Sequence, residues 1–226
     1  MGKIQELAEA TESQVISADA TKPEDLENLI NQSTEALGGK LDFILHSVGM
    51  SANVRKSKPY TGTNYDFFQK TLDISGLSLH KTLQTAYHLD AMNTGGSVVA
   101  LSYIAAQRTF PDYNDMSEAK AILETVVRNF GYHYGKEKGV RVNAVSQSPT
   151  MTTAGKGIKG FEAFYNYANS MSPLGNAPTD SCADYCVSLF SDYTRMVTMQ
   201  TLYHDGGFSS VGVSQAVMDQ FAPSDE

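Results

Sequence analysis

Apolar residues follow two different rhythms along this chain of 226 residues. A helical stripe at Leu26, Leu29, Ile30 and Leu37 predicts a helix that begins near residue 21 and ends at two glycines. Short apolar runs at 13–17, 41–46, 96–101, 139–145 and 199–203 predict strands. Helical patterns at 65–90, 114–136 and 179–191 separate them. This alternation predicts an α/β fold with a doubly wound, mostly parallel, Rossmann-like sheet.

Polar and glycine-containing segments follow the predicted strands. They are Asp19-Ala20, Ser47-Val48-Gly49, Ser102-Tyr103 and Pro149-Thr150. The carboxyl ends of parallel strands meet at one edge of a doubly wound sheet, where ligands bind. We therefore expect these segments to converge on a binding site.

Composition narrows the class of protein. The length suits a single domain over residues 1–226. A net charge of −8 argues against a nucleic-acid partner. No apolar run approaches the roughly 20 residues that span a bilayer, and the first ten residues lack a signal-peptide core, so we expect a cytoplasmic protein. Cys182 and Cys186 lie one helical turn apart, which is typical of core thiols, and we expect no metal site.

Tyr113 and Lys120 are the strongest chemical signal in the sequence. They lie seven residues apart, so two helical turns can place both on one face of a helix, with Tyr103 upstream. A lysine ammonium beside a phenol favours phenolate and lowers the barrier to proton transfer. This suits a reaction that builds negative charge on a carbonyl oxygen. A chance pair on an amphipathic helix remains the alternative.

Four segments carry a family resemblance. They are His46-Ser-Val-Gly49, Leu101-Ser-Tyr103 followed by Tyr113-x6-Lys120, Gly139-Val-Arg-Val-Asn143 with Pro149-Thr150, and His204-Asp-Gly-Gly207. The chain resembles the short-chain dehydrogenase/reductase superfamily, and more specifically its NADH-dependent bacterial enoyl-[acyl-carrier-protein] reductases. The wider superfamily spaces its Tyr and Lys by four residues, whereas seven is typical of this branch. The segment 147–154 and the tail after Gly207 resemble the version in Bacteroides-like bacteria.

The resemblance implies a role for each site residue. Tyr113 would hydrogen-bond the thioester carbonyl of an enoyl substrate and stabilise the negative charge that follows hydride transfer from NADH. Lys120 would hold the nicotinamide ribose, Tyr103 would line the substrate pocket, and Ser51 would lie beside the substrate.

The resemblance also implies a set of cofactor contacts and a lid over residues 151–172. The contacts are Asp19, Ala20, Ser47, Val48, Gly49, Lys120, Thr150, Met151, Thr152, Thr153 and Ala154. The same residues are open to simpler interpretations, as turn residues, a tightly packed turn after a strand, or threonines that cap a loop.

The chain departs from the family pattern at its start. It has no glycine-rich turn between a first strand and helix, the element that cradles a dinucleotide pyrophosphate, so we expect an N-terminal truncation that removes the first strand–helix–strand unit.

The expected function is that of an enoyl-acyl-carrier-protein reductase of type II fatty acid synthesis, with an enoyl thioester on acyl carrier protein as substrate. The alternatives are another short-chain reductase, such as a ketoacyl reductase, or a catalytically silent truncated module that associates with intact subunits. The resemblance further implies a homotetramer, with the helices at 65–90 and 113–137 as interfaces.

Overall fold

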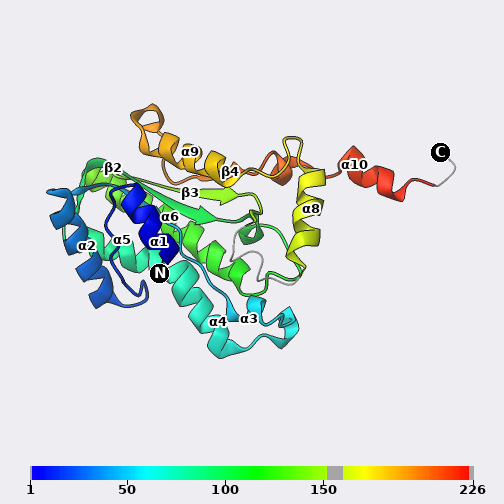
Figure 1. Cartoon of the computed structure of the whole chain (residues 1–226), viewed down its shortest axis with the longest axis horizontal. Coiled ribbons are helices and arrows are strands. Elements are labelled where there is room, and N and C mark those ends of the chain that lie inside the picture. Colours follow the sequence, from blue (N-terminus) through cyan, green and yellow to red (C-terminus); the bar gives the residue numbers. More distant parts are fainter. Residues whose placement is uncertain (1, 152–159, 224–226) are drawn as a thin grey trace.

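A parallel sheet forms the centre of the molecule (Figure 1). The computed structural model describes residues 2–151 and 160–223. Within these ranges the sheet has the order β1-β2-β3-β4, and all neighbouring strands are parallel. The strands are β1 Leu41–His46, β2 Met92–Ser102, β3 Arg141–Gln147 and β4 Thr201–His204. The predicted α/β, Rossmann-like class is confirmed, and the strands at 41–46, 96–101, 139–145 and 199–203 lie close to their predicted positions.

Helices cover both faces of this sheet. The helices α2, α5 and α6 form one layer, and α9 packs on β2 from the other face (Figure 1). The helix predicted over 65–90 is continuous, but it passes through one π-helical turn, Asp73–Leu77, between α4 and α5. The bounds are α1 Gly2–Ala10, α2 Pro23–Leu37, α3 Ala52–Arg55, α4 Tyr65–Leu72, α5 Ser78–His88, α6 Met116–Lys138, α8 Phe161–Met171, α9 Thr179–Phe190 and α10 Gln215–Met218.

Successive residues of a central strand belong to two separate apolar clusters, because their side chains point to opposite faces of the sheet. Val98 packs toward α5 and α6, together with Leu83 and Leu123. Val99 packs toward α9, where Cys182 and Cys186 belong to the same cluster. Both cysteines are buried and free, which confirms the interpretation of these residues as core thiols.

The strand predicted over 13–17 is wrong. This segment pairs with no strand in the described part of the chain, and half of the Val15 side chain is exposed. A short segment of this kind becomes a strand only where a neighbouring strand pairs with its backbone, and none of the described strands does so.

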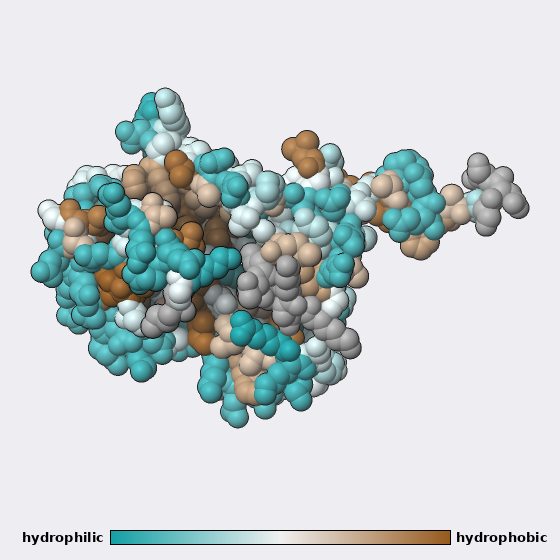
Figure 2. Space-filling model, viewed as in Figure 1, coloured by the Kyte–Doolittle hydropathy of each residue, from teal (hydrophilic) through white to brown (hydrophobic). Residues whose placement is uncertain are grey.

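The edge strand β1 carries exposed apolar side chains on the face toward α9. Phe43 and Leu45 are each about half exposed, and Phe43 stacks on Phe190 of α9 with ring centroids 4.9 Å apart. Figure 2 shows hydrophobic surface in the hollow between the N-terminal helices and α9. This edge lies on the side of the sheet away from β4.

A glycine allows α6 to approach the π-helical turn. A Cβ atom on Gly76 would lie only 2.7 Å from the carbonyl oxygen of Ala119, the residue before Lys120. Any side chain at this position would push α6 away. This close approach therefore sets the position of Lys120 on α6 relative to the ends of the strands.

The remaining described helices lie at the margins. The helix α10 projects away from the body near the C-terminus (Figure 1). In the ranges 2–151 and 160–223, no helix combines the length and apolarity that a membrane crossing requires.

Candidate active site

A cavity of about 420 Å³ lies where β1, β2 and β3 end. Its walls come from the loops after these strands and from α3, α6 and α8. The predicted residues that line it are Ser47, Val48, Gly49, Ser51, Tyr103, Tyr113, Lys120 and Thr150. The expected convergence of strand ends thus brings the three candidate catalytic side chains to one cavity.

Tyr113 does not share a helix face with Lys120, as the spacing had suggested, because α6 begins only at Met116. Asn114 adopts a left-handed backbone with φ of 38°, which interrupts the helix before it reaches Tyr113. The Asn114 side chain stabilises this turn by donating to the Lys58 carbonyl at 2.9 Å and accepting from Thr63 Oγ1 at 2.8 Å. Tyr113 therefore reaches the cavity from a turn.

Aromatic rings form the apolar wall of the cavity. The rings of Tyr103 and Tyr113 lie 5.0 Å apart between centroids, and Phe110 lies 5.4 Å from Tyr103. Phe164 of α8 packs on Phe110 with an edge-to-face contact at 5.2 Å. Phe110 had not been recognised as a site residue, although its position between the two tyrosines in sequence is a signal for it.

Both tyrosine hydroxyls are hydrogen-bond donors at neutral pH. Burial raises the pKa of Tyr113 and of Tyr103 above the usual value, so the expected stabilisation of phenolate by Lys120 is not what the folded chain shows. The Tyr103 hydroxyl is buried and has no hydrogen-bond partner among the described residues. Burying a donor without an acceptor costs free energy, unless a bound ligand accepts a hydrogen bond from it.

Lys120 enters the cavity from the second turn of α6. Its Nζ donates to the carbonyl oxygen of Leu101 at 2.7 Å, and the side chain is buried. Burial lowers the pKa of Lys120 to about 8, against the opposing charge of Glu124. A Cβ on Gly49 would lie 3.7 Å from Nζ, so this glycine leaves the ammonium accessible from the β1 side. An ammonium has three donors, and the Leu101 contact uses one.

Ser51 lies on the cavity wall with its hydroxyl already engaged. Its oxygen accepts a hydrogen bond from the backbone N–H of Val54 at 3.0 Å, as the N-cap of α3. The same hydroxyl donates a hydrogen bond to Asp115 Oδ1 at 2.6 Å. Asp115 is fully buried and also accepts from Asn53 Nδ2 at 2.6 Å. This network ties α3 to the start of α6, and its long sequence separation gave no signal in the chain.

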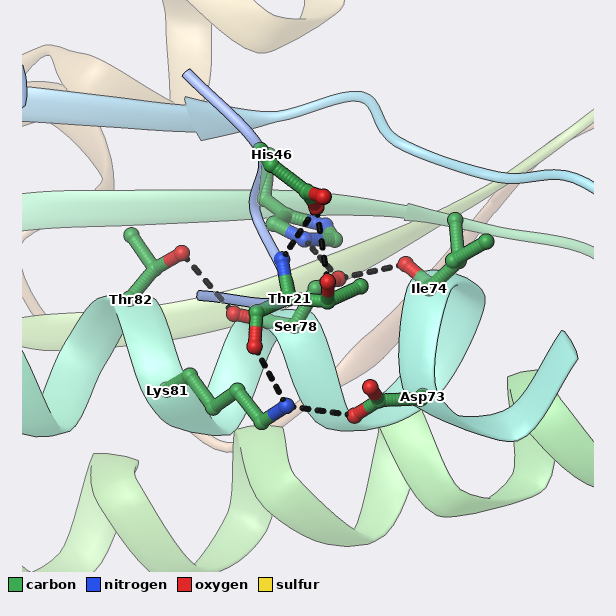
Figure 3. Close-up of polar contacts among 8 residues, drawn as sticks. Thr21, His46, Asp73, Ile74, Ser78, Lys81 and Thr82 are labelled. Atoms are coloured by element: carbon green, nitrogen blue, oxygen red, sulfur yellow. Dashed lines mark hydrogen bonds and ion pairs between the residues drawn. The ribbon is translucent and has the colours of Figure 1, made fainter. Parts of the chain in front are cut away.

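Asp19 and Ala20 lie outside the cavity lining. The Asp19 carboxylate accepts from the N–H and the hydroxyl of Thr21, as in a turn. Figure 3 shows Lys81 of α5 joining this segment, because its Nζ donates to the Thr21 carbonyl at 2.8 Å and pairs with Asp73 at 2.6 Å. Contact between Asp19, Ala20 and a cofactor stays a prediction.

The loop after β3 is only partly described. Thr150 lines the cavity and donates its hydroxyl proton to the Ser148 carbonyl at 3.0 Å. Met151 is 45% exposed and lies outside the lining. The predicted contacts at Thr152, Thr153 and Ala154 lie outside the described residues. Of the predicted lid over 151–172, α8 supplies Phe161 and Phe164 to the cavity wall.

A parallel Rossmann-like sheet with two tyrosine donors and a lysine at its strand ends defines a class of protein, the short-chain dehydrogenase/reductases. A family model described as "Enoyl-(Acyl carrier protein) reductase" matches residues 1–209. The chain belongs to this enoyl-acyl-carrier-protein reductase family.

Individual relatives agree with this assignment. The NADH enoyl-[acyl-carrier-protein] reductase FabI of Rickettsia bellii is 35% identical over 217 residues, which cover 95% of this chain and 81% of that protein. A second NADH enzyme, from Rhizobium meliloti, is 34% identical over 86% of this chain and 74% of that protein. The crystal structure of a FabI–NADH complex from Alistipes finegoldii is 58% identical, with a TM-score of 0.94 over 98% of this chain and 78% of that one.

Proposed function

We propose that this protein transfers hydride from NADH to the β-carbon of a trans-2-enoyl thioester carried by acyl carrier protein, in the cytoplasm. The observation that carries the proposal is the meeting of the Tyr103, Tyr113 and Lys120 donors in one largely apolar cavity. The relatives named above are NADH enoyl-[acyl-carrier-protein] reductases, which supports both the reaction and the cofactor.

The residues present suit the binding of NADH. Lys120 has N–H donors beyond its contact with Leu101, and ribose hydroxyls accept such donors. Gly49 leaves room beside that ammonium, and Ser47 and Val48 continue the same wall. NADH, when bound, supplies the hydride. We further propose that Asp19, Ala20 and the segment from Thr150 to Ala154 contact the cofactor.

The tyrosines supply stabilisation of the developing charge. Because burial raises the pKa of Tyr113, its hydroxyl keeps its proton and donates a hydrogen bond to the thioester oxygen. Reduction at the β-carbon places negative charge on that oxygen, and preorganised donors stabilise it strongly in an apolar site. The Tyr103 hydroxyl, which lacks a partner among the described residues, is the second donor, while Ser51 and the aromatic wall bound the acyl group.

NADH consumption with a crotonyl thioester tests the reaction. The proposal expects turnover that depends on Tyr113, and the absence of turnover at saturating NADH would refute it. An acetoacetyl thioester tests the alternative ketoacyl reductase, because that enzyme would reduce the ketone and leave the crotonyl thioester unchanged. Mixing the chain with an intact homologous reductase tests the silent module, which would change the activity of the partner without any of its own.

The expected truncation has its own measurement. NADH affinity is compared between this chain and a version extended upstream by a strand, a glycine-rich turn and a helix. We expect the extended version to bind NADH more tightly, because helix N-termini and glycine turns bind pyrophosphate. Equal affinity would contradict the expectation. The assignment to a Bacteroides-like version rests on the segment 147–154 and the tail after Gly207.

A homotetramer is the proposed assembly. Between α5 and α6 runs a groove of about 830 Å³, and the residues that line it include Ile122, Val126 and Phe130. A second copy of the chain would bury this apolar surface. Sedimentation of Thr125→Arg, which places a charge in the groove, should show smaller particles than Asn31→Arg on α2. Equal particle size in the two variants would place the interface elsewhere.

A further inference from the structure

Glu124 is a buried carboxylate that the reaction described above does not use. It lies on α6 one turn after Lys120, with only 4% of its surface exposed. Its Oε1 accepts from Ser102 Oγ at 2.7 Å and its Oε2 from Gln107 Nε2 at 3.0 Å. Both donors are neutral, so the contacts leave the negative charge in place. A buried charge of this kind is costly and calls for a physical reason.

Lys120 and Glu124 hold consecutive residues of one strand. Lys120 Nζ binds the carbonyl of Leu101, and Glu124 binds the hydroxyl of Ser102. The next residue is Tyr103, whose ring faces the cavity. These two contacts from one helix therefore fix the end of β2, and with it the direction in which the Tyr103 side chain points. Residues four apart on a helix are neighbours, so these contacts come from a single face of α6.

Other titratable groups lie near this face within the described residues. Burial, with a smaller contribution from the charge of Lys120, lowers the pKa of His46 on β1 to about 4, so the imidazole is neutral at pH 7. From the β4 side, Tyr203 lies near Glu124, Asp205 and Arg108, and burial raises the pKa of this tyrosine. Glu124 is the group whose charge raises the pKa of Lys120 against its burial.

We propose that Glu124 is a positioning residue of the reductase site, which fixes the end of β2 that bears Tyr103 and supplies the negative charge that keeps Lys120 an ammonium. The inference rests on the proposed function, since it gives both side chains their roles. Its test is chosen so that it can be read even if the reduction itself is not observed.

The first measurement is the titration of Lys120 itself. The protein is produced with ¹³C-labelled lysine, and the Lys120 signal is assigned by its loss in Lys120→Arg. In Glu124→Gln, which keeps the shape of the side chain, we expect the pKa of Lys120 to fall by about one pH unit, because an opposite charge has been removed nearby. The control Glu27→Gln removes one charge from the exposed face of α2 and should leave the Lys120 signal unchanged. An unchanged titration in Glu124→Gln overturns the charge role.

The second measurement is the pH profile of NADH consumption with a crotonyl thioester. A protonated Lys120 is lost as pH rises through its pKa, so the alkaline limb of kcat/KM should move to lower pH by the same shift. At pH 7.5 a fall in pKa from about 8 to about 7 reduces the protonated fraction roughly threefold. If the pKa of Lys120 falls but the alkaline limb of kcat/KM does not move, the link between Glu124 and turnover is overturned.

Ser102→Ala separates the two parts of the proposal. It removes the contact between β2 and Glu124 without changing a charge, so kcat should fall about tenfold through loss of alignment while the Lys120 titration stays as in the unaltered protein. Unaltered kcat in Ser102→Ala overturns the positioning role. If the unaltered protein consumes no NADH with the thioester, the proposed function fails, and the lysine titration still decides the effect of Glu124 on Lys120.

Discussion

Gly76→Ala tests whether the approach of α6 to the π-helical turn sets the site geometry. The new Cβ would lie 2.7 Å from the backbone oxygen of Ala119, and 3.2 Å and 3.3 Å from two Ile122 side-chain carbons. A backbone oxygen cannot rotate away as the end of a side chain can. Ordinary carbon–oxygen contacts begin near 3.3 Å, so α6 must retreat by roughly 0.6 Å at the residue before Lys120.

The energetic cost of that retreat is moderate. Overpacking typically costs about 1–3 kcal/mol, and replacing a helical glycine with alanine returns about 0.5–1 kcal/mol. The net loss of about 1 kcal/mol lowers Tm by about 3 °C in a domain of this size. The catalytic loss should be larger in proportion, because misplacement by 1 Å can cost about 100-fold, and we expect kcat to fall at least about tenfold.

Thermal unfolding and steady-state NADH consumption, measured together, decide this prediction. Gly135→Ala on α6 is the control, because its Cβ would meet the Val140 carbonyl at an ordinary 3.6 Å. We expect this control to be stabilised by about 0.5–1 kcal/mol, with kcat unchanged. Unaltered Tm and kcat in Gly76→Ala would refute the reasoning, since they would mean that the two helices separate without cost.

Three further predictions concern single side chains. Tyr113→Phe should lower kcat roughly 100-fold while NADH affinity, measured by fluorescence titration, changes less than twofold; equal losses in both would indicate a structural role. The pKa of His46 is about 4 in the folded state against a reference of 6.5, so the unfolded state takes up the proton at higher pH than the folded state does. The free energy of unfolding should therefore fall by about 3 kcal/mol as the pH is lowered from 6.5 to 4. His46→Asn should flatten that dependence in urea unfolding. Arg141→Met should cost about 2 kcal/mol by losing the guanidinium contact with the Leu189 carbonyl at 2.8 Å, with KM unchanged because Arg141 lies at the opposite end of β3.

The central strands β2 and β3 were predictable because they are buried on both faces. Runs such as Val98-Val99-Ala100 are apolar at every position, which a surface segment would not maintain. The segment at 13–17 has only two apolar residues, Val15 and Ile16, and strand formation also depends on a partner that local sequence does not specify. The site residues at 47–49 and 103 were predictable for the same topological reason, since they follow strands.

The details of the site were less accessible to sequence. Helical spacing placed Tyr113 on α6, whereas the left-handed Asn114, held by contacts with a distant loop, breaks the helix before it. Asp115 and Glu124 act through hydrogen bonds to residues far along the chain, and such pairs leave no periodic signal. The pKa of Tyr113 depends on burial, which only the packed structure reveals.

The parallel order of the strands also has a kinetic consequence. Leu45 of β1 pairs with Val99 of β2 across the intervening helices α3, α4 and α5. Within the described residues, no strand pair is joined by a hairpin. Such distant pairings incur loop-closure entropy before any contact compensates for it, which makes folding slow. In refolding experiments, helical signal should return early and the ability to bind a ligand last, because the cavity exists only once three strand ends have met.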